Sequence, residues 1–148
     1  MSDLHIAEFY QDVARILTAL YGVFPRPVTL YVEDISGPDE PDEYGVHSPR
    51  HQACFAAMHW LGEEGLIRFE DTIRQEAVDQ CVLTGQCFTA LLTPPPDLEP
   101  NNTLPTSVAQ ERSTVIYLLA QAVKQKDSGA ISAHMQLLLQ RMASRVNS

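Results

Sequence analysis

Apolar side chains recur every three or four positions over residues 3–21, which is the spacing of a helix that buries one face. The apolar positions of this stretch are Ile6, Phe9, Val13, Ile16, Leu17 and Leu20. Gly22 and the prolines Pro25 and Pro27 predict that the helix ends there, because proline cannot continue a helix interior. The β-branched and aromatic run at residues 28–32 then predicts a short strand.

A second helix is predicted from Pro49 to about Glu64. The hydroxyl of Ser48 can cap its first turn, and proline is favoured at the first helical position. After a stop at Gly65, residues 66–70 and 77–83 have the composition of strands and predict a hairpin. A short helix should follow, capped by Thr84 and carrying the apolar residues Phe88, Leu91 and Leu92.

Five prolines between residues 93 and 105 predict a stiff, extended linker. Beyond it, apolar stripes predict helices over residues 107–126 and 130–144, separated by a break at residues 127–129. Two antiparallel helices joined by a tight turn form a helical hairpin. The predicted organisation is therefore a domain over residues 1–92, a linker over 93–105 and a C-terminal hairpin over 106–148.

Residues 33–44 contain six acidic side chains, two prolines, one glycine and no basic side chain. This composition predicts an exposed, partly disordered loop. The alternative is a binding site for a cation or a basic partner. The acids do not have the alternating spacing around a central glycine that a calcium loop requires, so the solvated loop is the favoured interpretation.

Composition narrows the classes of function further. The chain has 148 residues, of which 45% are hydrophobic, enough for the core of one domain. Its net charge is −9; residues 101–148 have five basic and two acidic side chains, so the first hundred residues carry −12. Such a field repels phosphate and disfavours nucleic acid as a partner, although a local basic patch could override it.

The compartment is predicted from the N-terminus and the cysteines. No apolar run is long enough to span a membrane, and the N-terminus does not resemble a secretory signal. Three cysteines, an odd number, indicate reduced thiols. We therefore expect a cytoplasmic protein with no membrane partner.

Three motifs mark the first ninety residues. Phe24-Pro25-Arg26-Pro27 leads into a strand, Trp60-Leu61-Gly62-Glu63-Glu64-Gly65-Leu66-Ile67 joins a helix to a hairpin, and Val82-Leu83-Thr84 opens a further helix. Over about residues 4–92 their order resembles the winged-helix fold of small bacterial regulators. The resemblance implies an α+β, mostly helical fold, with a winged-helix-like domain followed by a C-terminal helical hairpin. Winged-helix proteins usually have two helices between the first strand and the wing, whereas here the acidic loop occupies the place of the first.

In DNA-binding winged-helix proteins, the helix corresponding to residues 49–64 enters the major groove. At 100° per residue, one side of this helix is predicted to face the core; it holds Cys54, Phe55, Met58, Leu61 and Gly65. The opposite side, predicted as an interaction face, holds Gln52, Ala56, His59 and Trp60. A groove-reading helix needs arginine, lysine, asparagine or glutamine at base edges, and this face offers one glutamine. DNA binding through this helix is therefore disfavoured.

Trp60 has two interpretations. The C-terminal helices of the same chain or of a dimer mate could cover it, because helices that are apolar on both sides are usually buried. Alternatively, it is an exposed anchor for a partner protein, since tryptophan is favoured at binding hot spots. We favour the first.

The sequence predicts no catalytic, cofactor-binding or metal-binding residues. His47 and His51 are four positions apart and Cys54 follows three later, but His47 precedes the helix cap and need not share a face with His51. Cys81 and Cys87 have no metal or redox spacing, and no nucleophile–base signature is present. A non-catalytic protein is therefore expected.

Two functional hypotheses remain. The favoured one is protein–protein interaction, as a homodimer and with other proteins; the predicted dimer contact comprises Ile116, Leu119, Val123, Met135, Leu138 and Met142. The alternative is a DNA-binding transcriptional regulator of the winged-helix type. Its phosphate contacts would be Arg68, Arg74, Lys124 and Lys126, with Arg141 and Arg145 as further basic residues.

Overall fold

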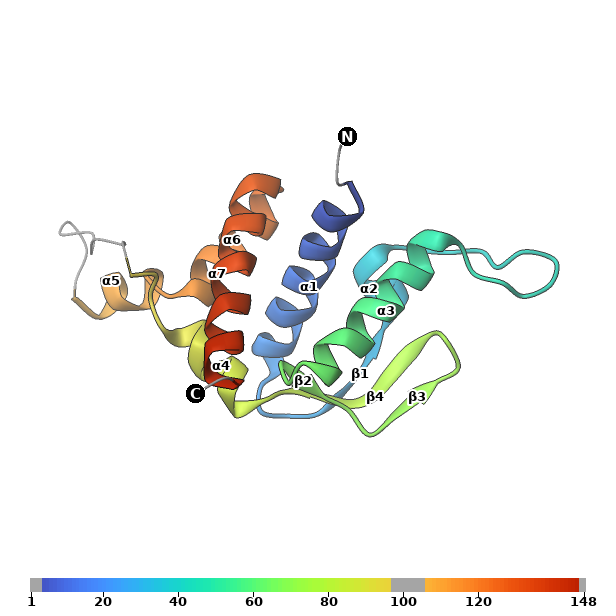
Figure 1. Cartoon of the computed structure of the whole chain (residues 1–148), viewed down its shortest axis with the longest axis horizontal. Coiled ribbons are helices and arrows are strands. Elements are labelled where there is room, and N and C mark those ends of the chain that lie inside the picture. Colours follow the sequence, from blue (N-terminus) through green and yellow to red (C-terminus); the bar gives the residue numbers. More distant parts are fainter. Residues whose placement is uncertain (1–3, 97–105, 147–148) are drawn as a thin grey trace.

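The computed structural model of the chain describes residues 4–96 and 106–146 (Figure 1). These residues form an α+β fold that is mostly helical, as the sequence predicts. The helices are α1 (Leu4–Val23), α2 (Val32–Ser36), α3 (Pro49–Glu63), α4 (Gly85–Leu92), α5 (Thr106–Arg112), α6 (Val115–Gln125) and α7 (Ser128–Val146). The strands are β1 (Val28–Tyr31), β2 (Ile67–Arg68), β3 (Asp71–Ile73) and β4 (Ala77–Leu83).

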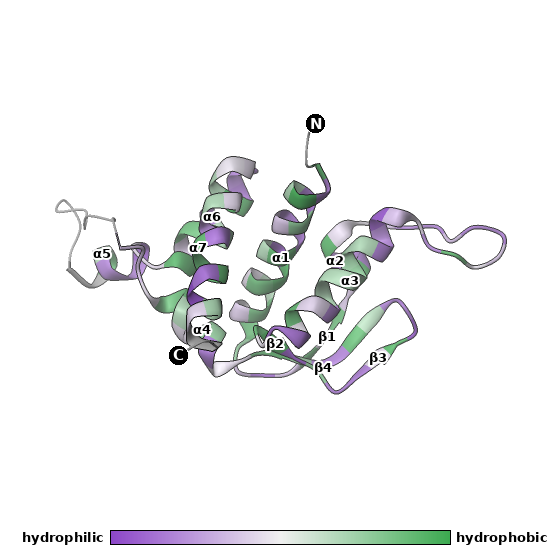
Figure 2. Cartoon of the chain, in the orientation of Figure 1, coloured by the Kyte–Doolittle hydropathy of each residue, from purple (hydrophilic) through white to green (hydrophobic). Residues whose placement is uncertain are grey.

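Helix α1 lies at the centre of the molecule. It packs against α2 and α3 on one side and against α6 and α7 on the other (Figure 1). Its predicted apolar stripe supplies the core side chains Val13, Ile16, Leu17 and Leu20, all of which are buried. The hydropathy colouring of Figure 2 shows apolar positions on the sides of these helices that face one another.

Strand β4 holds the small sheet together because the other three strands all pair with it, each antiparallel. Strand β1 lies along one edge, with Val28 opposite Cys81, and β2 and β3 share the other edge. Gln80 has φ near +53°, and the β1–β4 register shifts at this point. The inward side chains of β4 are buried and close the bottom of the helical core.

Both ends of α3 form as predicted. The Ser48 hydroxyl accepts a hydrogen bond from the backbone N–H of His51 at 3.2 Å, and Pro49 occupies the first turn. At the other end Gly65 has φ near +79°, a conformation that only glycine adopts without strain. The N–H of Leu66 bonds back to the carbonyl of Leu61 at 3.0 Å. The chain is thereby turned directly into β2.

The first residues of the predicted acidic loop are helical instead. Residues 33–36 belong to α2, whose Val32 and Ile35 are buried against the core, three positions apart on one face. Glu33 and Asp34 lie in its first turn, where a negative charge stabilises a helix. The exposed loop therefore begins only at Gly37. Helix α2 therefore lies between the first strand and α3, where winged-helix proteins usually have a helix and where the acidic composition of this chain predicted a loop.

The predicted helix over residues 107–126 is two helices. Thr114 interrupts it, because its hydroxyl accepts a hydrogen bond from the N–H of Tyr117 at 3.3 Å and so caps a new helix. Helix α6 ends at Lys126, which has φ near +56°. Asp127 then accepts from the N–H of Ala130, so α7 begins two residues earlier than predicted.

The six residues predicted as a dimer contact pack inside the chain. Ile116, Leu119, Met135, Leu138 and Met142 are buried, and Val123 is half-buried against the same core. The apolar stripes of α6 and α7 face each other and α1, so they are not a surface that a second copy could contact. A homodimer stays a prediction, but without these contacts.

The two predicted parts of the chain share one hydrophobic core. The buried cluster runs from α1 and α3 through β4 to α6 and α7. Arg141 on α7 adds a polar link, because its guanidinium donates hydrogen bonds to the carbonyl oxygens of Ala90, Thr93 and Pro94 at the end of α4. Of the predicted linker, residues 97–105 lie outside the described residues, as do Met1 to Asp3.

An ion pair joins α1 to the start of α3. The carboxylate of Asp12 is almost fully buried, and the guanidinium of Arg50 donates to both of its oxygens. This two-point geometry is the strongest form of a carboxylate–arginine contact. The partner carboxylate raises the pKa of Arg50 further. The buried charge of Asp12 therefore depends on Arg50.

Replacing Arg50 with methionine should destabilise the protein by about 3 to 5 kcal/mol, because a buried carboxylate is left without its partner. The measurement is the free energy of unfolding from urea denaturation at pH 7. Arg26→Met is the matched control, since Arg26 is exposed, and it should change the stability by less than about 0.5 kcal/mol. Equal stabilities for the two variants would contradict the assignment.

All three cysteines should be unreactive in the folded protein. Cys54, Cys81 and Cys87 are buried free thiols, and burial raises the pKa of each to about 12. At pH 8 only about one thiol in ten thousand is then ionised. A disulfide reagent should titrate three thiols in guanidinium chloride and react slowly with the native protein. Rapid reaction of any native cysteine would show that the core is open there.

Candidate functional site

The outer face of α3 carries the residues predicted as an interaction face. Gln52 and Ala56 are exposed, and His59 and Trp60 are half-buried. The one arginine of this helix, Arg50, is held by Asp12. The face therefore remains partly accessible, and it presents apolar and neutral polar groups instead of cations.

The burial of Trp60 is intermediate between the covered and the exposed state that the sequence allowed. Its indole packs edge-on against the ring of Phe9, with ring centroids 5.3 Å apart and planes at 82°. The covering group thus comes from α1, whereas α6 and α7 were the predicted cover. The indole is half-buried against the core and also lines two hollows beside α3.

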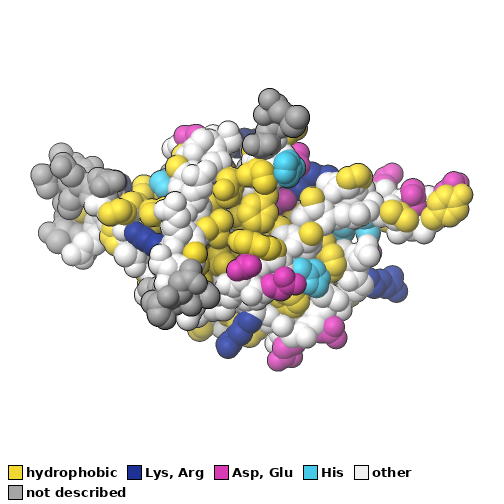
Figure 3. Space-filling model, viewed as in Figure 1, with side chains coloured by type: hydrophobic (Ala, Val, Ile, Leu, Met, Phe, Trp, Pro, Cys, Tyr) yellow, Lys and Arg dark blue, Asp and Glu magenta, His cyan; other side chains and the backbone are white. Residues whose placement is uncertain are grey.

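A groove of about 540 Å³ runs beside Trp60, between the N-terminal half of α1 and α3. Ile6 and Phe9 form one wall, and Ala53, Ala56 and Trp60 form the other. Figure 3 shows hydrophobic side chains gathered over α1 between α7 and α3. The alanines permit close approach to the backbone of α3, and the aromatic rings provide a rigid edge.

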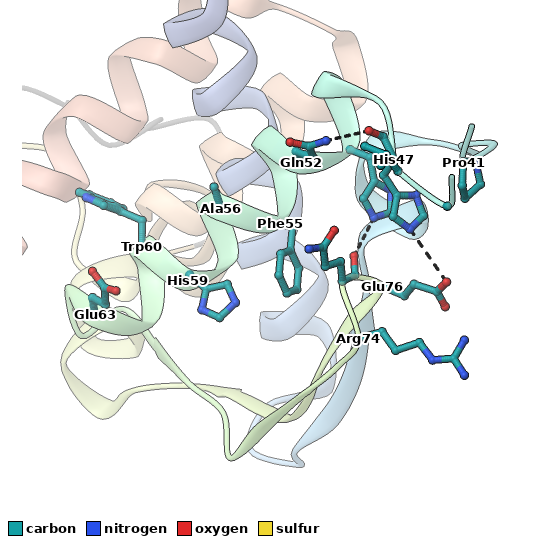
Figure 4. Close-up of a pocket in the computed structure, with 14 residues that line it drawn as sticks. Pro41, His47, Gln52, Phe55, Ala56, His59, Trp60, Glu63, Arg74 and Glu76 are labelled. Atoms are coloured by element: carbon teal, nitrogen blue, oxygen red, sulfur yellow. Dashed lines mark hydrogen bonds and ion pairs between the residues drawn. The ribbon is translucent and has the colours of Figure 1, made fainter. Parts of the chain in front are cut away.

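A larger hollow of about 1010 Å³ continues along α3, from Trp60 to the loop 37–48 and the β3–β4 turn (Figure 4). Phe55 lines it, half-buried, although the helical angles placed this ring on the core side. Its ring lies edge-on to His59, with centroids 4.7 Å apart. The core position is taken instead by His51, whose exposed fraction is 1%. Helix α3 is therefore rotated slightly from the predicted orientation.

Asp39, His47 and His51 meet at the end of this hollow. One atom of each lies within 4.8 Å of the others, and the two imidazole rings are stacked, 3.7 Å apart with planes at 6°. Nδ1 of His47 lies 2.9 Å from Oδ2 of Asp39, and Nδ1 of His51 lies 3.9 Å from the same oxygen. The two histidines thus come together, against the expectation that they need not share a face.

The protonation pattern of this cluster follows from its hydrogen bonds. Nδ1 of His47 carries its proton, because the carboxylate of Asp39 can only accept. Nε2 of His51 carries its proton, because its partner is the backbone carbonyl of Gln75 at 2.7 Å (Figure 4). In a neutral ring, Nδ1 of His51 then bears a lone pair, and this buried nitrogen has no hydrogen-bond partner.

Asp39 is held as a carboxylate. Its Oδ2 accepts a hydrogen bond from the backbone N–H of Ser48 at 3.1 Å in addition to the contact with His47. Hydrogen bonds from Ser48 and His47 lower the pKa of Asp39 from 3.8 to about 2. A negative oxygen therefore faces the lone pair of His51 at neutral pH.

Cys54, which the sequence placed near these histidines, lies elsewhere, buried in the core toward α1 and α2. Asp39 is the member that the sequence analysis missed. It is one of six acids in a loop without periodicity, and no spacing rule singles it out. The pair of histidines four positions apart was the only available signal.

The residues proposed as phosphate contacts do not form one patch. Arg68 on β2, Arg74 in the β3–β4 turn, and Lys124 and Lys126 at the end of α6 are all exposed. The β3–β4 turn and α6 lie on opposite sides of the molecule (Figure 1). Glu76 lies two residues after Arg74, in the same turn, and weakens the local positive potential. Among the described residues, these four cations therefore form no single basic surface.

Comparison with known protein families, with characterised proteins and with solved structures finds no match to this chain. Among the described residues, no helix combines the length and the apolar character needed to cross a membrane. Inferences about function therefore rest on the geometry of α3 and its surroundings.

The fluorescence of Trp60, the single tryptophan of the chain, should report a half-exposed indole. We expect emission between that of a buried and a fully solvated tryptophan, with ready quenching by acrylamide, because Trp60 is half-buried and lines two solvent-accessible hollows. Strongly blue-shifted emission that acrylamide does not quench would instead show that another surface covers the indole. Phe9→Ala should shift the emission to the red.

Proposed function

We propose that this protein is a non-catalytic interaction module with a winged-helix-like arrangement, and that the groove between α1 and α3 binds an apolar segment of a partner protein. The observation that carries the proposal is the groove itself, where apolar side chains of two helices stay accessible beside Trp60. Large accessible apolar patches mark sites of interaction in soluble proteins.

The apolar stripe of α1 supports this assignment. Four of its residues fill the core, but the stripe continues to the N-terminal turn, where Leu4 is 65% exposed and Ile6 is 40% exposed. No described element covers these side chains. Trp60 and Phe9 are rigid aromatic groups of the kind that dominate binding energies at interfaces.

Charge favours a partner segment with basic residues around its apolar anchors. The first hundred residues carry a net charge of −12, and Glu8 borders the groove directly while Glu63 follows Trp60 along α3. Complementary charge speeds association and selects partners, whereas a second acidic copy of this chain meets repulsion. The homodimer is therefore the less favoured occupant, although an apolar contact of sufficient area would offset that repulsion.

A cytoplasmic location agrees with three free thiols and no disulfide among the described residues, because oxidising compartments favour disulfides. The same thiols support a non-catalytic role, since their raised pKa removes the thiolate that a nucleophile needs. Regulation of transcription by DNA binding is the alternative, and the scattered cations argue against it.

Site-specific photo-cross-linking tests the proposal. A photoreactive phenylalanine analogue at Ala56, which is exposed in the groove wall, should give one discrete adduct in cells that make the protein. The same analogue at Gln140, exposed on α7, is the positional control and should not give that adduct. Ile6→Glu should reduce the yield at position 56 at least several-fold, because it places a charge in the groove, while Gln140→Glu should not.

The mass of the adduct identifies the occupant. An adduct with a different protein supports the proposal, and an adduct of two copies of the chain supports the homodimer through this face. Equal yields at positions 56 and 140, or no effect of Ile6→Glu, would overturn the proposal. Circular dichroism of the Ile6→Glu variant checks that its fold is unchanged.

A further inference from the structure

The cluster of Asp39, His47 and His51 lies apart from the apolar groove, at the other end of the α3 face. Asp39 and His47 come from the loop 37–48, and His51 comes from the first turn of α3. Both histidines line the larger hollow, although His47 is only 9% exposed and His51 only 1% exposed. The cluster has no part in the interaction proposed above and needs its own explanation.

His51 provides the first argument. Burying an imidazole nitrogen without a hydrogen bond costs free energy, and here the unpartnered Nδ1 belongs to a side chain that is 1% exposed. Its other nitrogen donates to the carbonyl of Gln75, which fixes the tautomer and the orientation of the ring. Histidines that bind metals are held in the same way, with one N–H on a carbonyl or carboxylate and the other nitrogen free to coordinate.

The charge around this nitrogen provides the second argument. The lone pair of His51 Nδ1 faces a carboxylate oxygen of Asp39 at 3.9 Å, so two electron-rich atoms are directed at one another. Among the described residues, the ion-pair partners of Asp39 are the two histidines, with no lysine or arginine. A cation placed between this oxygen and Nδ1 of His51 would satisfy both atoms.

We propose that Asp39, His47 and His51 form a binding site for a divalent transition-metal ion. Two imidazole nitrogens and one carboxylate oxygen are a donor set that suits zinc and neighbouring metals better than calcium or magnesium, which prefer oxygen ligands. Glu76 is a further carboxylate beside the cluster, because its Oε1 lies 4.0 Å from Nε2 of His47, on the edge of that ring away from Asp39 (Figure 4).

Binding requires one rearrangement. The stacked rings lie in nearly parallel planes, so a single ion cannot lie in both planes at once. The ring of His51 is held by Gln75, whereas His47 belongs to the loop and can turn about its side-chain bonds. His47 then exchanges its hydrogen bond with Asp39 for a bond to the ion. The bound ion would connect the loop 37–48 to the first turn of α3.

Zinc titration of the purified, chelator-treated full chain tests the site. Isothermal calorimetry with Zn²⁺ at pH 7.5 should show one ion per chain, and Asp39→Asn and His47→Gln should each weaken binding at least tenfold. His59→Gln is the matched control, because His59 lines the same hollow outside the cluster, and it should bind as the unaltered chain does. Cobalt(II) should give the visible absorption of a site with nitrogen and oxygen ligands.

Folding is checked separately. Asp39 and His47 lie in the loop 37–48, outside the helices and strands, so their variants should keep the circular dichroism of the unaltered protein, and His51→Gln is tested only if it does the same. Absence of zinc binding by the unaltered chain at micromolar concentrations would overturn the proposal. So would an equal loss in His59→Gln, which would indicate non-specific binding by surface histidines. If NMR shows a proton on Nδ1 of His51 that zinc does not displace, the cation between the groups is a proton and the metal site is excluded.

Discussion

Burial of α1 on two sides is the constraint on which the rest of the structure depends. A helix with a wide apolar surface needs partners around much of its circumference, and α1 finds them in α2 and α3 on one side and in α6 and α7 on the other. In this arrangement the apolar stripes of α6 and α7 are buried against α1 of the same chain. The first turns of α1 are the less buried part of the helix, and there they form the groove with α3.

Much of the fold was predictable because its signals are local. Periodicity, the Ser48 cap and the glycine stop at Gly65 place the main helices within a few residues. Three elements were not predictable in this way. Strand β3 lies at Asp71–Ile73, between the two strands that the composition predicts. Helix α2 is stabilised by burial of Val32 and Ile35, a tertiary effect that outweighs the acidic composition of its sequence. The side chain of Thr114 caps a new helix at a position where the apolar periodicity alone predicts one continuous helix.

The site was predictable only in part, for a related reason. Helical angles identify an outward face of α3 with Ala56 and Trp60, but a small rotation of the helix exchanges Phe55 for His51 at the core. The meeting of Asp39 with two histidines depends on the path of an irregular loop, and no periodicity describes such a path. Likewise, the wide apolar stripes on α6 and α7 predict that these helix faces are buried, but they do not show whether the residues that bury them belong to the same chain or to a second copy.

The packing of α1 against α7 has a consequence for how the protein is made. These helices are about a hundred residues apart in the sequence; the buried side chains of α1 lie from its middle onward, and those of α7 run along most of its length. Chains are synthesised from the N-terminus, so α1 leaves the ribosome long before α6 and α7, which cover one of its sides, have been made. Until those helices are made, this apolar side of α1 is open to solvent and to other nascent chains. The core can close only once the later helices have been made, so folding of the whole body awaits the C-terminal hairpin.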